Sequence, residues 1–161
     1  ISIIRPATVC GISPRTRLDV SVNMLTYQAF KNKKITVFGG DQVRPNIHIE
    51  DLVDLYIFFL NDKKKLNGIF NAGFENLSIR QIAKNISKEI ESKIIYIKKT
   101  NDKRSYRVDS SKLKKVGFKP KKNVMIAIRE LKDYFKKQNI KKINENSFSI
   151  NWLKKKKIFK K

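Results

Sequence analysis

The stretch GGDQVRPNIHIEDLVD, residues 39–54, decides how the rest of the chain is interpreted. It places a double-glycine turn before Arg44, then a short apolar strand over residues 45–49, then a helix that begins with Glu50 and Asp51. Carboxylates in a first helical turn meet unpaired N–H groups and the positive end of the helix dipole. Arg44 is the unusual residue, because it puts a permanent cation beside a strand with a core-like pattern. A guanidinium there suits a phosphate, which it can bind through two parallel hydrogen bonds.

Composition predicts one globular domain in a reducing compartment. The 161 residues are 40% hydrophobic, which is enough for a real core. No apolar run approaches the roughly 20 residues that cross a bilayer, and the start of the chain lacks the basic leader of a signal peptide. With a single cysteine, Cys10, the chain cannot form an internal disulfide. We expect Cys10 to be a small buried residue near the end of a strand. We therefore expect no membrane association, a cytoplasmic location and, with one histidine and no Cys/His cluster, no metal site.

The net charge of +23 suggests a second hypothesis, a basic module that binds nucleic acid or another polyanion. Only 8 of the 37 basic residues are arginine, and lysine, isoleucine and asparagine together make up 65 of the 161 residues. That bias indicates a drift toward A/T-rich codons, whereas a selected nucleic-acid surface favours arginine interleaved with aromatic residues. We expect no specific nucleic-acid partner. Salt-sensitive polyanion binding remains open, and the salt dependence of binding would reveal it.

The periodicity of apolar residues predicts alternating strands and helices over residues 1–135. Strands are expected at residues 1–9, 35–38, 45–49, 69–72 and 94–97. Helices are expected at residues 17–31, 50–61, after a capping box at Ser78 and Gln81, from 109 to the left-handed cap at Gly117, and from Asn123 to about 136. Residues 136–161 hold ten lysines and one acid, Glu145. We interpret them as a mobile or loosely docked lysine-rich tail.

Six segments in a fixed order carry a resemblance to a known family. They are Arg5–Gly11 (RPATVCG), Val37–Arg44 (VFGGDQVR), Ile47–Asp51 (IHIED), Phe70–Gly73 (FNAG), and Val108–Lys112 (VDSSK) followed by Gly117–Pro120 (GFKP). Together they resemble the C-terminal half of extended short-chain dehydrogenases, the NAD-dependent sugar-nucleotide epimerases and dehydratases. The resemblance covers residues 1 to about 135. It implies an α/β fold, the C-terminal portion of an extended Rossmann-type fold with a small mixed α/β substrate-binding lobe.

The family's cofactor-binding and catalytic motifs are not in this sequence. It contains no G-x-x-G-x-x-G loop, and no tyrosine in the corresponding place is followed by lysine four residues later. The resemblance therefore implies a fragment of an enzyme that uses NAD or NADP, acts on a nucleoside-diphosphate sugar and pairs as a homodimer at full length. We expect no catalytic residue in this chain and no activity from the chain alone. A related reductase with a non-nucleotide substrate is the other enzyme that fits.

The resemblance also implies the site residues. The arginine after the glycine turn, Arg44, would bind the diphosphate, unless it forms a structural salt bridge with Asp51 or Glu50. Arg104 or Lys99 would supply a second cation, since the family's R-x-G-D segment is altered here, with Asn101 in place of its glycine.

The remaining implied residues lie on the expected first helix and on two strands. Asn23 would contact the phosphate or the sugar, and Phe38 and Val37 would flank the base, although one of that pair is expected in the core. Pro6, Ala7 and Thr8 would line the nicotinamide side of the cleft. Arg15 and Arg17 occupy a loop that faces the sugar in the family. His48 is expected to be structural or to act through a neighbour.

Overall fold

The computed structural model describes residues 1–62, 65–98, 102, 104–138 and 145–156. Strands in chain order are β1 (Ser2–Pro6), β2 (Thr8–Cys10), β3 (Lys34–Phe38), β4 (Val43–His48), β5 (Gly68–Ala72), β6 (Glu75–Ser78) and β7 (Lys93–Ile97). Helices are α1 (Ser21–Asn32), α2 (Ile49–Leu60), α3 (Ile79–Glu89), α4 (Ser111–Lys115), α5 (Val124–Lys137) and α6 (Ser149–Lys155), with a short 3₁₀ helix, η2 (Glu145–Ser147). None of the helices in these described ranges is long and apolar enough to cross a membrane.

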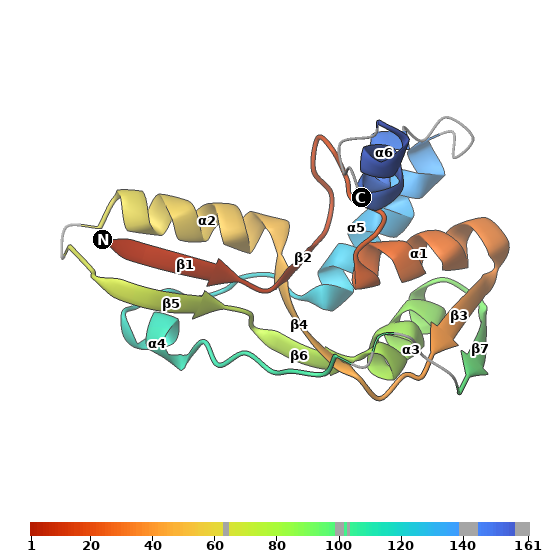
Figure 1. Cartoon of the computed structure of the whole chain (residues 1–161), viewed down its shortest axis with the longest axis horizontal. Helices are drawn as coiled ribbons and strands as arrows, with labels where there is room; N and C mark the ends of the chain where they lie inside the picture. Colours follow the sequence, from red (N-terminus) through yellow and green to blue (C-terminus); the bar gives the residue numbers. More distant parts are fainter. Residues whose placement is uncertain (63–64, 99–101, 103, 139–144, 157–161) are drawn as a thin grey trace.

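The strands form three small sheets along an elongated molecule (Figure 1). At one end β1 and β5 pair in parallel, with α2 and α4 beside them. In the middle β4 pairs in parallel with β2 and antiparallel with β6. At the other end β3 and β7 pair in parallel near α1 and α3. This mixture of parallel sheets and helices confirms the expected Rossmann-type α/β class with a mixed lobe.

The expected strand over residues 1–9 is split at Ala7, because the chain changes sheet there. Pro6 cannot donate to a ladder, and the Ala7 N–H still donates to the Ala72 carbonyl at 2.8 Å before β2 turns to β4. Gly73 lies opposite, where β5 gives way to β6. A Cβ atom at Gly73 would be 2.7 Å from the Ala7 Cβ, so only glycine lets the two chain segments cross this closely.

Local sequence signals correctly predicted several helix ends. Ser78 and Gln81 form the expected capping box, and Asn123 caps α5 by accepting from Ile126 N at 3.0 Å. Gly117 has a φ of 104° after α4, as expected for a left-handed residue at a helix end. His48 caps α2, since its Nδ1 accepts from Glu50 N at 3.2 Å, which gives this histidine a structural role.

β6 and α1 also differ from the sequence prediction. β6 was not predicted, because Glu75 and Asn76 are polar and its strand conformation comes from pairing with β4. α1 begins at Ser21, four residues later than the expected start at Arg17. The preceding backbone is bonded elsewhere, with Leu18 N donating to Ser147 O at 2.7 Å.

Three apolar clusters hold these elements together. The largest joins α1, α3, α5 and β3, and the second joins α2, α4 and β5. The third surrounds Leu18, Leu131 and Phe135 and includes Phe148 from the C-terminal segment. That contact corrects the expectation of a loosely held tail for residues 145–149, whereas residues 139–144 and 157–161 lie outside the described part of the chain.

Cys10 provides a test of this packing through pH. Burial raises the pKa of its thiol from 9.0 to about 12, with the Glu75 carboxylate as the next cause. A raised folded-state pKa stabilises the fold fully below the unfolded pKa, and that stabilisation is lost as the pH rises toward the folded value. Above pH 9 we predict that the unfolding free energy of the parent falls relative to that of Cys10→Ala by about 1.4 kcal/mol per pH unit. A difference that stays constant from about pH 8 to about pH 10.5 would contradict the buried thiol, since the lysines titrate alike in both proteins.

Candidate functional site

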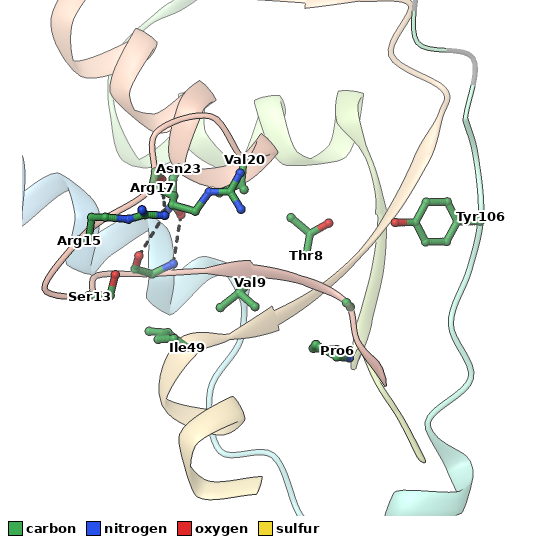
Figure 2. Close-up of a pocket in the computed structure, with 12 residues that line it drawn as sticks. Pro6, Thr8, Val9, Ser13, Arg15, Arg17, Val20, Asn23, Ile49 and Tyr106 are labelled. Atoms are coloured by element: carbon green, nitrogen blue, oxygen red, sulfur yellow. Dashed lines mark hydrogen bonds between the residues drawn. The ribbon is translucent and has the colours of Figure 1, made fainter. Parts of the chain in front are cut away.

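Two adjoining cavities lie on the side of the molecule where β2 meets the start of α1. The larger has a volume of about 600 Å³ and the smaller about 320 Å³. Thr8 and Val20 line both of them, so the two cavities meet at these residues. A combined space of this size lies in the range of small-molecule sites. Figure 2 shows the larger cavity, with Thr8 near its middle and Tyr106 on the side opposite Arg15 and Arg17.

The three residues predicted to bind the cofactor lie together at the larger cavity. Pro6, Ala7 and Thr8 line it where the chain passes from β1 to β2. Pro6 and Ala7 present apolar surface. Thr8 adds a hydroxyl (Figure 2). The crossing at Ala7 and Gly73 therefore places an apolar wall with one polar group at the edge of the β1–β5 sheet.

Asn23 lines the larger cavity together with residues of the loop that borders it, and it is 2% exposed. Its Oδ1 accepts from Gly11 N at 3.1 Å, while its Nδ2 donates to Gly11 O at 3.1 Å and Arg17 O at 2.9 Å (Figure 2). Both amide protons are therefore used, and one lone pair of Oδ1 remains for another donor. The main contribution of Asn23 is to hold the loop over residues 11–17.

Arg44 lines the smaller cavity, on β4, with its side chain 11% exposed. Its Nη2 contacts Asp102 Oδ2 at 2.9 Å, and its Nη1 donates to the Val43 carbonyl at 3.0 Å and to the Arg104 carbonyl. The alternative role that we gave Arg44, a salt bridge with Asp51 or Glu50, named the wrong partner, because its ion pair is with Asp102. Asp51 instead accepts from the backbone N–H groups of Lys121 and Lys122.

Arg104 is joined to Arg44 through a shared carboxylate. Its Nε and Nη2 donate to the two oxygens of Asp102 at 2.8 and 2.9 Å. The Arg104 guanidinium, with that of Arg44 as a smaller cause, holds the pKa of Asp102 well below its usual range. The trio therefore keeps one net positive charge at neutral pH, and both arginines line the smaller cavity. Lys99 and Asn101, named with Arg104 in the sequence prediction, lie outside the described residues.

The two residues predicted to flank a base separate in the structure. Phe38 is 53% exposed and lines the smaller cavity. Val37 is 1% exposed and packs in the core formed by α1, α3 and α5. Neighbouring residues on a strand point to opposite faces, so only one of the pair can reach a ligand with its side chain. Of the two residues, Phe38 therefore remains the candidate to contact a base.

The N-terminus of α1 opens onto the smaller cavity, which the sequence did not reveal. Val20 is its N-cap and makes no side-chain capping bond, and the first turn holds no acidic residue. Met24 N donates to Val20 O at 2.8 Å, so the amides that precede Met24 in this helix have no helical carbonyl to bond. The Ser21 hydroxyl is buried there without a hydrogen-bond partner, and both Val20 and Ser21 line the cavity. Such a helix start favours an anion.

Tyr106, Arg15 and Arg17 complete the lining of the larger cavity. Tyr106 lies between the strand expected at residues 94–97 and the helix expected from residue 109, and its ring centroid is 6.0 Å from the Arg44 guanidinium carbon. Arg15 and Arg17 lie in the loop that faces the sugar in the family according to the resemblance, and here they line the larger cavity. Arg17 Nε contacts Asp19 Oδ1 at 2.9 Å.

Two other groups of residues resemble a catalytic pair and a metal site, but their contacts are structural. Tyr27 and Lys31 have the Tyr-x-x-x-Lys spacing, yet the Tyr27 ring packs edge-on against Phe135 at 5.6 Å, away from both cavities. His48, Glu50 and Glu130 bring three possible metal ligands within 4.8 Å of one another.

The ligand atoms of that second group are already used within the protein. Lys122 Nζ lies 2.7 Å from Glu50 Oε1 and 2.7 Å from Glu130 Oε1. The His48 ring accepts at Nδ1, so its proton sits on Nε2 and is donated to Glu130. The arrangement favours an ion-pair cluster over a metal centre.

Comparison with known proteins shows which enzymes this chain is similar to. The model of the NAD dependent epimerase/dehydratase family matches residues 1–73. The UDP-glucuronic acid 4-epimerase of Bacillus cereus, solved with UDP-glucuronic acid and NAD, is 28% identical, with a TM-score of 0.70 over 84% of this chain. Residues 1–73, fewer than half of the 161, are thus similar to the NAD-dependent epimerase/dehydratase family.

Other solved members have the same fold at lower identity. UDP-N-acetylglucosamine 4-epimerase from Bacillus cereus is 23% identical, with a TM-score of 0.70 over 86% of this chain. A dTDP-glucose 4,6-dehydratase from Bacillus anthracis, solved with NAD, is 19% identical, with a TM-score of 0.71 over 85%. This chain spans 45%, 47% and 45% of the three structures, in the order given, and so about half the length of the family enzymes that it matches.

Asn23→Ala tests whether this amide maintains the border of the larger cavity. The substitution leaves the Gly11 and Arg17 backbone groups without their partner, and each buried unsatisfied group costs about 1–3 kcal/mol. We predict a loss of at least about 2 kcal/mol of unfolding free energy, measured by urea denaturation. Asn32→Ala, an exposed asparagine at the end of the same helix, should change stability by less than about 0.5 kcal/mol. Equal effects in the two variants would show that the Asn23 hydrogen bonds do not hold the loop.

Proposed function

We propose that this chain forms the nucleotide-sugar-binding part of an NAD-dependent epimerase or dehydratase. The observation that carries the proposal is that the uncapped start of α1 and the Arg44 guanidinium line one cavity. Backbone N–H groups at a helix start and a planar cationic fork are complementary to phosphate oxygens. Arg104 adds a second cation to the same cavity. A diphosphate, with two negative charges, matches this set of donors.

The positions of the other residues orient such a ligand. The base would extend toward Phe38, whose exposed ring can stack on it. The sugar would extend past Thr8 into the larger cavity, between Arg15 and Tyr106. Holding the diphosphate and the base uses binding energy from remote groups to place the reacting carbon. In this proposal the chain binds and orients, and its own residues transfer no proton or hydride.

Pro6, Ala7 and Thr8 would form the wall that faces the nicotinamide. Their apolar surface suits a flat ring, and the family is NAD-dependent. NAD, when bound, supplies the acceptor and donor of a hydride. The dinucleotide itself would be held by the part of a family enzyme that this sequence does not contain, because no glycine-rich dinucleotide loop is present.

A broad apolar surface supports association with such a cofactor-binding part. Ile1, just before β1, is 97% exposed, and Ile3, on β1, is 50% exposed. Leu60, at the end of α2, is 84% exposed. Val53, Tyr56 and Ile57 of α2 are each nearly half exposed. β1 pairs only with β5 among the described strands, which leaves one edge of a parallel sheet open. We infer that this end of the molecule is covered in the whole enzyme.

Arg44→Ala tests the diphosphate assignment. Removing a guanidinium that binds a phosphate costs about 1.5–3 kcal/mol, so the dissociation constant for a nucleoside-diphosphate sugar should rise about ten- to a hundredfold. UDP-, dTDP-, GDP- and CDP-sugars would be compared by isothermal titration calorimetry at moderate salt, where nonspecific polyanion binding is weakened.

Arg129→Ala is the matched control for that experiment. Arg129 lies on α5, is 62% exposed and contacts Glu89 Oε1 at 2.7 Å, so its loss removes one arginine and one surface ion pair outside both cavities. We expect unchanged binding in this variant. If Arg44→Ala folds and binds as tightly as the parent, the diphosphate assignment is wrong. Equal weakening in both variants would instead indicate a nonspecific effect of net charge.

A further inference from the structure

The C-terminal segment around residues 147–149 packs against the loop that borders the larger cavity. Leu18, at the end of that loop, is 2% exposed, and its N–H donates to the Ser147 carbonyl at 2.7 Å. Figure 1 shows α6 beside the loop that follows β2, above α5. Residues far apart in sequence are therefore joined by a backbone hydrogen bond next to the proposed sugar-binding space.

Two side chains of the same segment extend the contact. Arg15 Nη2 donates to Ser149 Oγ at 3.3 Å, and the Phe148 ring lies edge-on to Tyr27 of α1 at 5.8 Å. Ser147 and Ser149 are each 8% exposed, so both are largely covered by these contacts. Three consecutive residues thus contact the loop and the helix that follows it.

The loop is consequently held by two sets of contacts. Asn23 binds Gly11 and Arg17, and the C-terminal segment binds Arg15 and Leu18. An arginine side chain that is fixed before binding loses less conformational entropy when its ligand arrives. Arg15 is the loop arginine whose guanidinium is bonded to the C-terminal segment, and it lines the larger cavity.

We propose that residues Ser147–Ser149 are a positioning element for the sugar end of the site. Ser147 holds the loop through its carbonyl, and Ser149 directs the Arg15 guanidinium so that its other N–H groups can donate to sugar oxygens. This inference rests on the proposed function, because it assumes that a sugar occupies the larger cavity. It assigns a ligand-binding consequence to a segment whose sequence suggested only a basic tail. The nucleotide end, at Arg44 and α1, does not depend on it.

The test compares UDP with UDP-glucose in the full chain and in Ser149→Ala. UDP reaches only the diphosphate and base contacts, whereas UDP-glucose also reaches the Arg15 end. We expect Ser149→Ala to weaken UDP-glucose binding about three- to tenfold, the effect of losing one typical hydrogen bond, and to leave UDP binding unchanged. Ser149→Thr keeps the hydroxyl and should restore UDP-glucose binding. Ser111→Ala, on α4 at the far end of the molecule, should match the parent with both ligands.

A ligand-independent measurement checks the physical link. Phe148→Ala removes the ring that packs on Tyr27 and should speed amide hydrogen exchange at Leu18, while Ile128 in the α5 core keeps the parent rate. Unchanged exchange at Leu18 would overturn the inference. So would equal changes in UDP and UDP-glucose binding, or no change in either, with Ser149→Ala. If the parent binds neither ligand, the proposed function itself fails, and that outcome differs from binding of both ligands without a Ser149 effect.

Discussion

The site depends on one buried side-chain amide. Asn23 joins the end of β2, through Gly11, to the chain entering α1, through Arg17. These three hydrogen bonds fix the loop that borders the larger cavity and, because Asn23 is in the first turn of α1, they also fix the helix start that opens onto the smaller one. Burying an amide is favourable only when its donors and acceptor are satisfied, and here the backbone of the loop satisfies them.

Charge and shape then divide the site into two parts. The smaller cavity collects the Arg44 and Arg104 guanidiniums and the unpaired start of α1, with Asp102 as the internal counter-charge. The larger cavity combines the apolar wall of Pro6 and Ala7 with polar groups on the loop. A ligand with a dianionic middle, a flat base and a polar sugar would be complementary to this division, which is the physical basis of the proposed function.

Features set by neighbouring residues were predictable from the sequence, and those set by distant contacts were not. The capping box at Ser78, the Asn123 cap and the left-handed Gly117 depend on a few adjacent residues, and each was confirmed. β6 depends on pairing with β4, and the later start of α1 depends on Ser147, more than a hundred residues away. The ion-pair partner of Arg44 is Asp102 for the same reason, since no local pattern selects it over Glu50 or Asp51. For Phe38 and Val37 the alternation of the strand was readable, but which residue faces the core was set by α1 and α3.

The central claim is that phosphate oxygens bind between the start of α1 and Arg44. Nuclear magnetic resonance of the ¹⁵N-labelled chain, titrated with a UDP-sugar, tests it most directly. The account predicts that the backbone amide signals of Ser21 and Val22 and the Nε–H signal of Arg44 shift together and saturate at one dissociation constant. Shifts spread over lysine-bearing surfaces, with these three signals unmoved, would contradict it.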